Sequence, residues 1–229
     1  MTARKDPAAR MILMNRFRSA LPEIVGSAQE GQLGLTCLDI IERYEEPHRE
    51  YHTVEHVCAN LDLFDEVKKD IDIRLHRIIE LALIYLHAVY DPASEKNVDE
   101  CAQLAQFQLL GLGLPVHMVI WVTECIVGTT HVADLSRGKA APQWVADIDL
   151  LSLAVFPESF DRNSEKIRAE HFSIPGFTET RWAEGRKAFL KRMLAKKPLY
   201  YNQAYREKYE EAAKHNLRRH LRSYAEAAM

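Results

Sequence analysis

The strongest constraint on the fold is an almost continuous apolar stretch at residues 74–90, RLHRIIELALIYLHAVY. Its apolar residues recur at steps of one and three positions, the spacing that places side chains on one face of an α-helix. Leu81, Ile84 and Tyr85 widen this face until most of the helix surface is apolar. Because such a surface has to be covered by other elements, we expect residues 74–90 to form the central helix of the fold.

The remainder of the chain also favours helices. No stretch shows sustained alternation with β-branched residues, so we expect almost no strand. Glycine, proline and serine cluster in four segments, which predicts loops there. With no internal repeat and no long linker, we predict an all-α fold in which residues 1–229 form a single-domain helical bundle. The predicted loops are residues 26–34, 111–115, 136–142 and 173–177. Further helices are predicted at residues 9–21, 36–45, 52–68, 97–110, 115–128, 142–155, 159–171, 178–194 and 202–226.

The composition indicates the kind of environment and partner. Hydrophobic residues make up 47% and charged residues 28% of the 229 residues, as in ordinary globular proteins, and the net charge is only -3. A charge this small gives no strong field for a nucleic acid polymer or a membrane, so neither is an expected partner. The four cysteines form no CxxC pair, the start of the chain has no signal-peptide pattern, and the richest apolar run is too short to span a bilayer. We therefore expect a cytoplasmic protein.

Histidines and acidic residues supply the candidate chemistry. His52 and His56 are four residues apart in RYEEPHREYHTVEHV (43–57), so on a helix both imidazoles would project from one face. His87 lies at the end of the expected central helix, and Asp147 and Asp149 lie in an otherwise apolar helix. Imidazole and carboxylate together suit zinc, iron or manganese. A single histidine on a helix more often packs or lies at the surface. A carboxylate in an apolar helix needs a partner, so Asp149 strengthens the metal interpretation most.

Several segments, taken in order, resemble the HD superfamily of metal-dependent phosphohydrolases. They are YEEPHREYHTVEHV, YLHAVYDP, NVDECA, TTH and DIDLLSL, and the resemblance covers roughly residues 40–220. The chain is most similar to a bacterial subfamily of largely uncharacterised hydrolases. This resemblance implies an HD-like helical domain that acts on a phosphate ester or a nucleotide. It also implies a divalent metal ion as cofactor, which could be zinc, iron, manganese or magnesium.

The resemblance also implies a set of metal ligands. His56 matches the first metal-binding histidine, His87 matches the histidine of the His-Asp doublet, and Asp149 matches the distal aspartate, with Asp147 as the less favoured choice. The aspartate of the doublet falls on Ala88, which has no ligand atom. Three protein ligands and a water suffice for one catalytic zinc ion, but a two-metal site is not expected.

Other residues receive roles from the same resemblance. His52 matches a position that faces the leaving group, where it would act as general acid, and Arg49 could hold a phosphate oxygen. Asp91 could replace the missing doublet aspartate, although Pro92 disfavours helical geometry at that point. His131 matches a family position, and both an outer-shell role and a role in capping a helix end are open.

Three interpretations of function follow. The first is a metal-dependent phosphohydrolase whose activity is impaired by Ala88. The second is a catalytically degenerate HD domain that binds a nucleotide or a protein partner without turnover. The third is a helical scaffold with no ligand, which the retained histidines argue against. The expected ligand is a small phosphorylated molecule or nucleotide, and an apolar helical surface would allow a homodimer.

Overall fold

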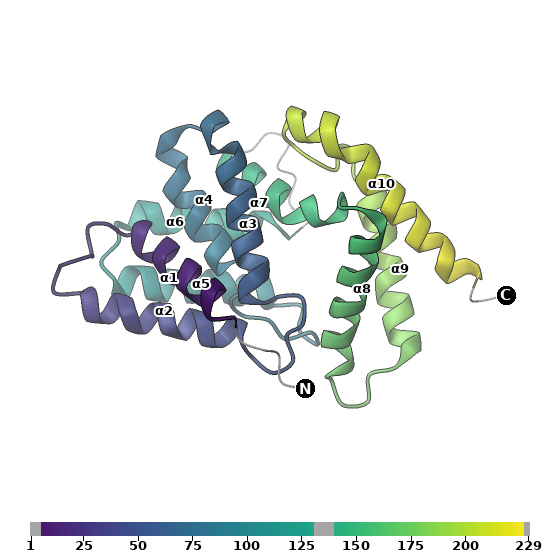
Figure 1. Ribbon diagram of the computed structural model, residues 1–229, viewed down its shortest axis with the longest axis horizontal. Coiled ribbons are helices and arrows are strands. Elements are labelled where there is room, and N and C mark those ends of the chain that lie inside the picture. Colours follow the sequence, from purple (N-terminus) through teal and green to yellow (C-terminus); the bar gives the residue numbers. More distant parts are fainter. Residues whose placement is uncertain (1–5, 131–139, 227–229) are drawn as a thin grey trace. The chain divides into compact units, whose positions relative to one another are not determined.

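The computed structural model describes residues 6–130 and 140–226, which contain ten α-helices and no strand (Figure 1). The helices account for more than half of the chain, so the predicted all-α fold is confirmed. Among the described residues, no helix is long and apolar enough to cross a membrane. The helices are α1 (Pro7–Ser19), α2 (Glu30–Tyr44), α3 (Val54–Val67), α4 (Ile73–Tyr85), α5 (Asn97–Gly111), α6 (Val116–Gly128), α7 (Ala140–Leu150), α8 (Pro157–Phe172), α9 (Glu179–Ala195) and α10 (Gln203–Glu226).

The chain divides into two compact units, Met1–Ile148 and Asp149–Met229. The division falls inside α7, so Asp149 continues a helix that belongs to the first unit up to Ile148. The first unit contains α1 to α6 and most of α7, and the second contains α8, α9 and α10. The prediction of one domain over residues 1–229 stays a prediction.

Helix α4 is the centre of the first unit, as the sequence predicts. It packs against α1, α3, α5 and α6. From Ile78 onward its side chains are almost all buried, on every face of the helix. Burial of each such aliphatic side chain contributes roughly 1.5–3 kcal/mol. The position of α4 is therefore strongly determined, and so is the position of the segment that follows it.

Helix α4 ends at Tyr85, five residues earlier than predicted, because Tyr44 replaces the next helical hydrogen bond. The Tyr44 hydroxyl donates to the carbonyl of Ile84 at 2.9 Å and accepts the N–H of His87 at 3.2 Å. In a continuing helix the N–H of His87 would instead pair with the carbonyl four residues earlier. The chain therefore leaves the helix at His87, and no periodicity in the sequence indicates this.

The predicted loop at residues 26–34 is wrong in its second half, because α2 begins at Glu30. Gly26 has φ +78°, a conformation that favours glycine, and forms the turn before the helix. The Glu30 carboxylate accepts the N–H of Gly26 and pairs with Arg18. These contacts start the helix early, and Gly31 and Gly34 lie inside it at the usual modest cost in helix propensity.

In the second unit, polar side chains bind carbonyls at the end of α7 and just after it. The hydroxyl of Tyr200 donates to the carbonyl of Leu150 at 2.9 Å. The side-chain amide of Asn216, on α10, donates to the carbonyls of Leu153 and Val155 at 3.0 and 2.8 Å. Since these groups are largely buried, each hydrogen bond avoids a desolvation penalty of about 1–3 kcal/mol. The end of α7 is therefore held by side chains that lie about 50 residues or more along the chain.

His220 lies in the packing of α8 against α10. Its ring packs edge-on against Phe160 and stacks on Tyr224. Its Nδ1 lies 3.3 Å from the hydroxyl of Ser164, which also accepts from the guanidinium of Arg186. Burial first, and then the nearby Arg186 charge, lower the pKa of His220 from 6.5 to about 4. His220 is therefore neutral in the folded protein at pH values where it is protonated in the unfolded chain.

This pKa difference predicts acid-sensitive stability. As pH falls from about 6.5 to about 4, the unfolded chain takes up a proton that the folded chain does not, so the free energy of unfolding decreases. We expect His220→Phe, which keeps an aromatic ring but cannot titrate, to flatten this decrease in urea unfolding curves measured across that range. His215→Phe, at an exposed position of α10, is the control and should keep the wild-type profile. An unchanged profile in His220→Phe would contradict the assignment.

Candidate metal centre

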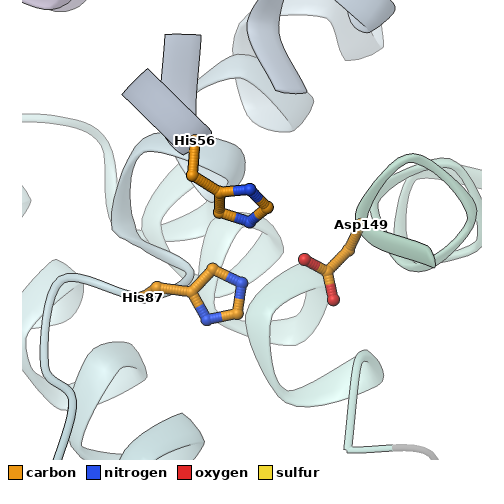
Figure 2. A group of neighbouring side chains, drawn as sticks. All are labelled: His56, His87 and Asp149. Carbon is orange, nitrogen blue, oxygen red and sulfur yellow. The ribbon is translucent and has the colours of Figure 1, made fainter. Parts of the chain in front are cut away.

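Three side chains that the sequence analysis selects lie together in the structure. His56, His87 and Asp149 each offer a ligand atom, and these atoms all lie within 4.8 Å of one another. Figure 2 shows a ring nitrogen of each histidine turned toward the carboxylate of Asp149. All three residues are half-buried, so the cluster is reachable by solvent yet partly shielded from it. Two imidazoles and one carboxylate form a donor set that fits a divalent transition metal.

His56 is positioned by α3. The helix buries an apolar face that includes Val57, Leu61 and Phe64, and His56 lies at the edge of that face. The side-chain amide of Asn60, one helical turn further along, lies 3.5 Å from Nε2 of His56. Asn60 is only 4% exposed. Sequence reasoning missed this residue, although an asparagine four residues after a candidate ligand, on the same helical face, could have indicated it.

His87 lies two residues after the end of α4 and is positioned by hydrogen bonds of its backbone. Its N–H donates to Tyr44, and its carbonyl accepts from Arg49 at 2.6 Å. The rings of His87 and His56 have centroids 5.5 Å apart. Hydrogen bonds thus hold both peptide units that flank the Cα atom of His87, which limits the directions that its ring can take.

Asp149, and not Asp147, completes the cluster. Asp147 is fully buried at 0% exposed, whereas Asp149 is half-buried beside the two histidines. Two positions along an α-helix are separated by about 200° around the axis, so the two carboxylates of α7 point to nearly opposite sides. The choice of Asp149 over Asp147 in the sequence analysis agrees with this geometry.

His52 lies beside the cluster, but for a different reason from the one predicted. Helix α3 begins at Val54, after an extended N-cap residue, Thr53, so His52 precedes the helix and does not share a helical face with His56. Its ring centroid is still only 4.7 Å from that of His87 and 5.9 Å from that of His56. The ring of Tyr90 also packs against that of His52, with centroids 4.1 Å apart. Aromatic packing, and not helical spacing, places His52 near the candidate ligands.

Arg49 is a buried cross-link between two segments of the site. It is 1% exposed, and its guanidinium donates to the carbonyls of His52, His87 and Ala88 at 3.2, 2.6 and 3.1 Å. Nε and Nη2 also contact the carboxylate of Glu46 at 3.0 and 2.9 Å. The guanidinium thus hydrogen-bonds to three backbone carbonyls and to Glu46, and Nη2 forms an ion pair with the same carboxylate. A phosphate oxygen would have to displace a protein acceptor, so the geometry favours a role in positioning the site.

Ala88 is fully buried at 0% exposed, where the doublet aspartate of the resembled family would stand. The next residue, Val89, exchanges contacts with the thiol of Cys101, which accepts its N–H at 3.3 Å and donates to its carbonyl at 3.2 Å. Burial raises the pKa of the Cys101 thiol to about 11, so it remains protonated and able to donate. The backbone at residues 87–89 is therefore fixed without any contribution from a carboxylate.

Another sequence candidate, Asp91, is not part of the cluster. Asp91 lies in the loop after α4, is exposed, and accepts the N–H of Ala93 at 2.8 Å. It is therefore wrong as a substitute for the missing doublet aspartate, because the early end of α4 removes the helical geometry that would point it toward His87. His131 lies outside the described residues.

Comparison of the chain with protein-family models, with curated proteins and with solved structures gives no match. Function is therefore argued from the chemistry of the site itself. What the site provides is a half-buried set of two imidazoles and one carboxylate, a third histidine beside it, and a buried arginine that fixes the backbone around it.

The cluster predicts metal binding that depends on each of its three members. We expect His56→Ala, His87→Ala and Asp149→Asn each to lower the affinity for Zn²⁺ at least about tenfold, because even outer-shell changes cost this much in metal sites. Isothermal titration calorimetry on the metal-free protein measures the affinity. His117→Ala, at an exposed position of α6, is the control and should bind as the wild type does. Equal affinities in all four variants would contradict the site.

The contacts of Arg49 predict a large effect on stability. Arg49→Met leaves three carbonyls without their donor, and each unsatisfied buried group costs about 1–3 kcal/mol, so we expect the free energy of unfolding to fall by about 3 kcal/mol or more. Arg43→Met is the control, because Arg43 forms a half-exposed pair with Asp39 worth less than about 1 kcal/mol. Urea unfolding in the absence of any ligand measures both. If Arg49 served only to bind substrate, its replacement would leave this stability unchanged.

Proposed function

We propose that the protein is a metal-dependent phosphohydrolase of the HD type, acting on a small phosphate ester or nucleotide. The observation that carries this proposal is the convergence of His56, His87 and Asp149 within 4.8 Å of one another. The same residues match the ligand positions of the HD superfamily, in the order in which that superfamily uses them. An HD-like domain and a divalent cofactor belong to the same proposal.

The roles of the chain's own groups follow from their positions. A divalent cation bound by the three ligands would act as a Lewis acid on a phosphoryl oxygen and would favour ionisation of water. The ring of His52 packs against those of His87 and Tyr90, and from this position it would give a proton to a leaving oxygen. Arg49 holds the carbonyls of His52 and His87, and so keeps the proton donor and a ligand at a fixed separation.

Ala88 favours a second candidate, a degenerate HD domain that binds a nucleotide or protein partner without turnover. The side chain of Ala88 has no ligand atom, so the cluster has one carboxylate, whereas a cluster with a complete His-Asp doublet would have two. With fewer anionic ligands the site holds a divalent ion less strongly. Slow turnover, or none, distinguishes the two candidates.

The function is tested by two substitutions with opposite expected effects. Ala88→Asp adds a carboxylate next to His87, and we expect it to raise both the bound metal per chain and the hydrolysis of a generic phosphomonoester or phosphodiester. His52→Gln removes the proton donor, and we expect hydrolysis to fall about 10²–10⁴-fold with little change in bound metal. All proteins are purified identically and assayed with manganese, iron or zinc.

The alternative outcomes separate the candidates. If the wild type binds metal but neither it nor Ala88→Asp hydrolyses any phosphate ester, the binding-domain candidate is favoured. A buried carboxylate at residue 88 without a cation nearby would be costly, so a lower melting temperature of metal-free Ala88→Asp that recovers on metal addition would support the site. If Ala88→Asp changes neither bound metal nor turnover, the missing aspartate does not limit this protein.

A further inference from the structure

We propose that Asn60 is a fourth protein ligand of the metal centre, through its side-chain amide oxygen. The proposal rests on the metal site of the proposed function and adds a residue that the family resemblance does not assign. The cation that it suits is a divalent ion that accepts mixed nitrogen and oxygen ligands, such as manganese, iron or zinc.

The position of Asn60 on α3 brings it to the site. Residues four apart on a helix are neighbours on one face, so Asn60 lies directly beside His56 along the helix. Its neighbours on the buried side of α3 include Val57, Leu61 and Phe64, which are apolar. At 4% exposed, the amide is buried, and a buried amide is costly unless its polar atoms are paired.

The distance between the Asn60 amide nitrogen and Nε2 of His56 is closer to that of two ligands on one ion than to that of a hydrogen bond. The nitrogen of the Asn60 amide lies 3.5 Å from Nε2 of His56, beyond the usual range of about 2.7–3.2 Å for N–H hydrogen bonds. Two atoms that bind one zinc ion tetrahedrally, each at roughly 2.1 Å, lie about 3.4 Å apart. The amide is therefore already at the separation expected of two ligands on the same ion.

Rotation of the amide turns this contact into a ligand. The nitrogen and oxygen of an asparagine side chain exchange places when the amide turns by 180°, with almost no change in shape. As placed, the NH₂ group faces a ring nitrogen whose lone pair a cation would need. In Figure 2 the ring nitrogen of His56 farther from its Cβ, which is Nε2, faces the side of His87 and Asp149. A cation on that side of the ring would attract the amide oxygen and repel the NH₂ group.

An amide ligand also offsets the missing carboxylate without restoring its charge. Two neutral imidazoles, one carboxylate and one amide carry a net charge of -1, so a bound divalent cation leaves the site at +1. A site with two carboxylates would be neutral with the same cation. The excess positive charge favours an anionic ligand such as a phosphate group, at the expense of weaker cation binding.

The experiment uses Co²⁺ as the probe, because its visible absorption reports the number and kind of its ligands. The full chain and the variants Asn60→Leu, Asn60→Asp and His56→Ala are stripped of metal and titrated with Co²⁺ by calorimetry and by absorption. We expect Asn60→Leu, which has a similar size and no ligand atom, to lower Co²⁺ affinity about 10–100-fold and to change the visible spectrum. Asn60→Asp should bind Co²⁺ more tightly than the wild type, because its carboxylate occupies the same position with a charge.

Each outcome decides between the proposals. If His56→Ala loses Co²⁺ binding while Asn60→Leu keeps the wild-type affinity and spectrum, the metal site stands and the role of Asn60 is overturned. If the folded wild type binds no Co²⁺, the metal site and the role of Asn60 fall together. If Asn60→Leu does not fold, Asn60→Asp decides: a tighter affinity supports direct ligation, and an unchanged affinity and spectrum overturn it.

Discussion

The geometry of the site depends on one buried guanidinium. Arg49, at 1% exposed, binds the carbonyls of His52, His87 and Ala88, which come from two segments about 35 positions apart in the chain. A charged group is tolerated at this depth because Glu46 offsets its charge and because its N–H groups donate to three carbonyls. The segment before α3 and the segment after α4 are also joined by Nε2 of His48, which lies 2.9 Å from the carbonyl of Tyr90, but Arg49 contacts three carbonyls at once.

A fixed backbone explains how a site can persist with a changed ligand set. The contacts that hold residues 87–89 come from Arg49, from the hydroxyl of Tyr44 and from the thiol of Cys101, and none of them uses the side chain at residue 88. The direction of His87 is therefore independent of whether its neighbour is an aspartate or an alanine. The alanine at residue 88 can therefore lower the metal affinity while the positions of the three candidate ligands are kept.

Much of the fold could be predicted, because helices follow from local periodicity. Ten helices were expected and ten lie in the described residues, with ends that differ by a few residues. Two of the larger errors, at the start of α2 and the end of α4, come from side-chain contacts with other elements, Glu30 with Arg18 and Tyr44 with Ile84. Periodicity predicts a helix and its apolar face. It does not predict that a hydroxyl on another helix will form a hydrogen bond with a backbone group and so end the helix.

The sequence by itself determined the all-α class, the central position of α4 and the residue types of the site: His56, His87 and Asp149. The fold class and the place of α4 depend on hydrophobic spacing, a local property of a chain, whereas the choice of these three ligands came from the family resemblance. Only the tertiary structure decided that His52 approaches from outside the helix and that the donors of Arg49 face the backbone. It also decided that Asn60 lies 3.5 Å from a ligand nitrogen. These depend on distances between separate segments, which packing sets and a linear pattern does not contain.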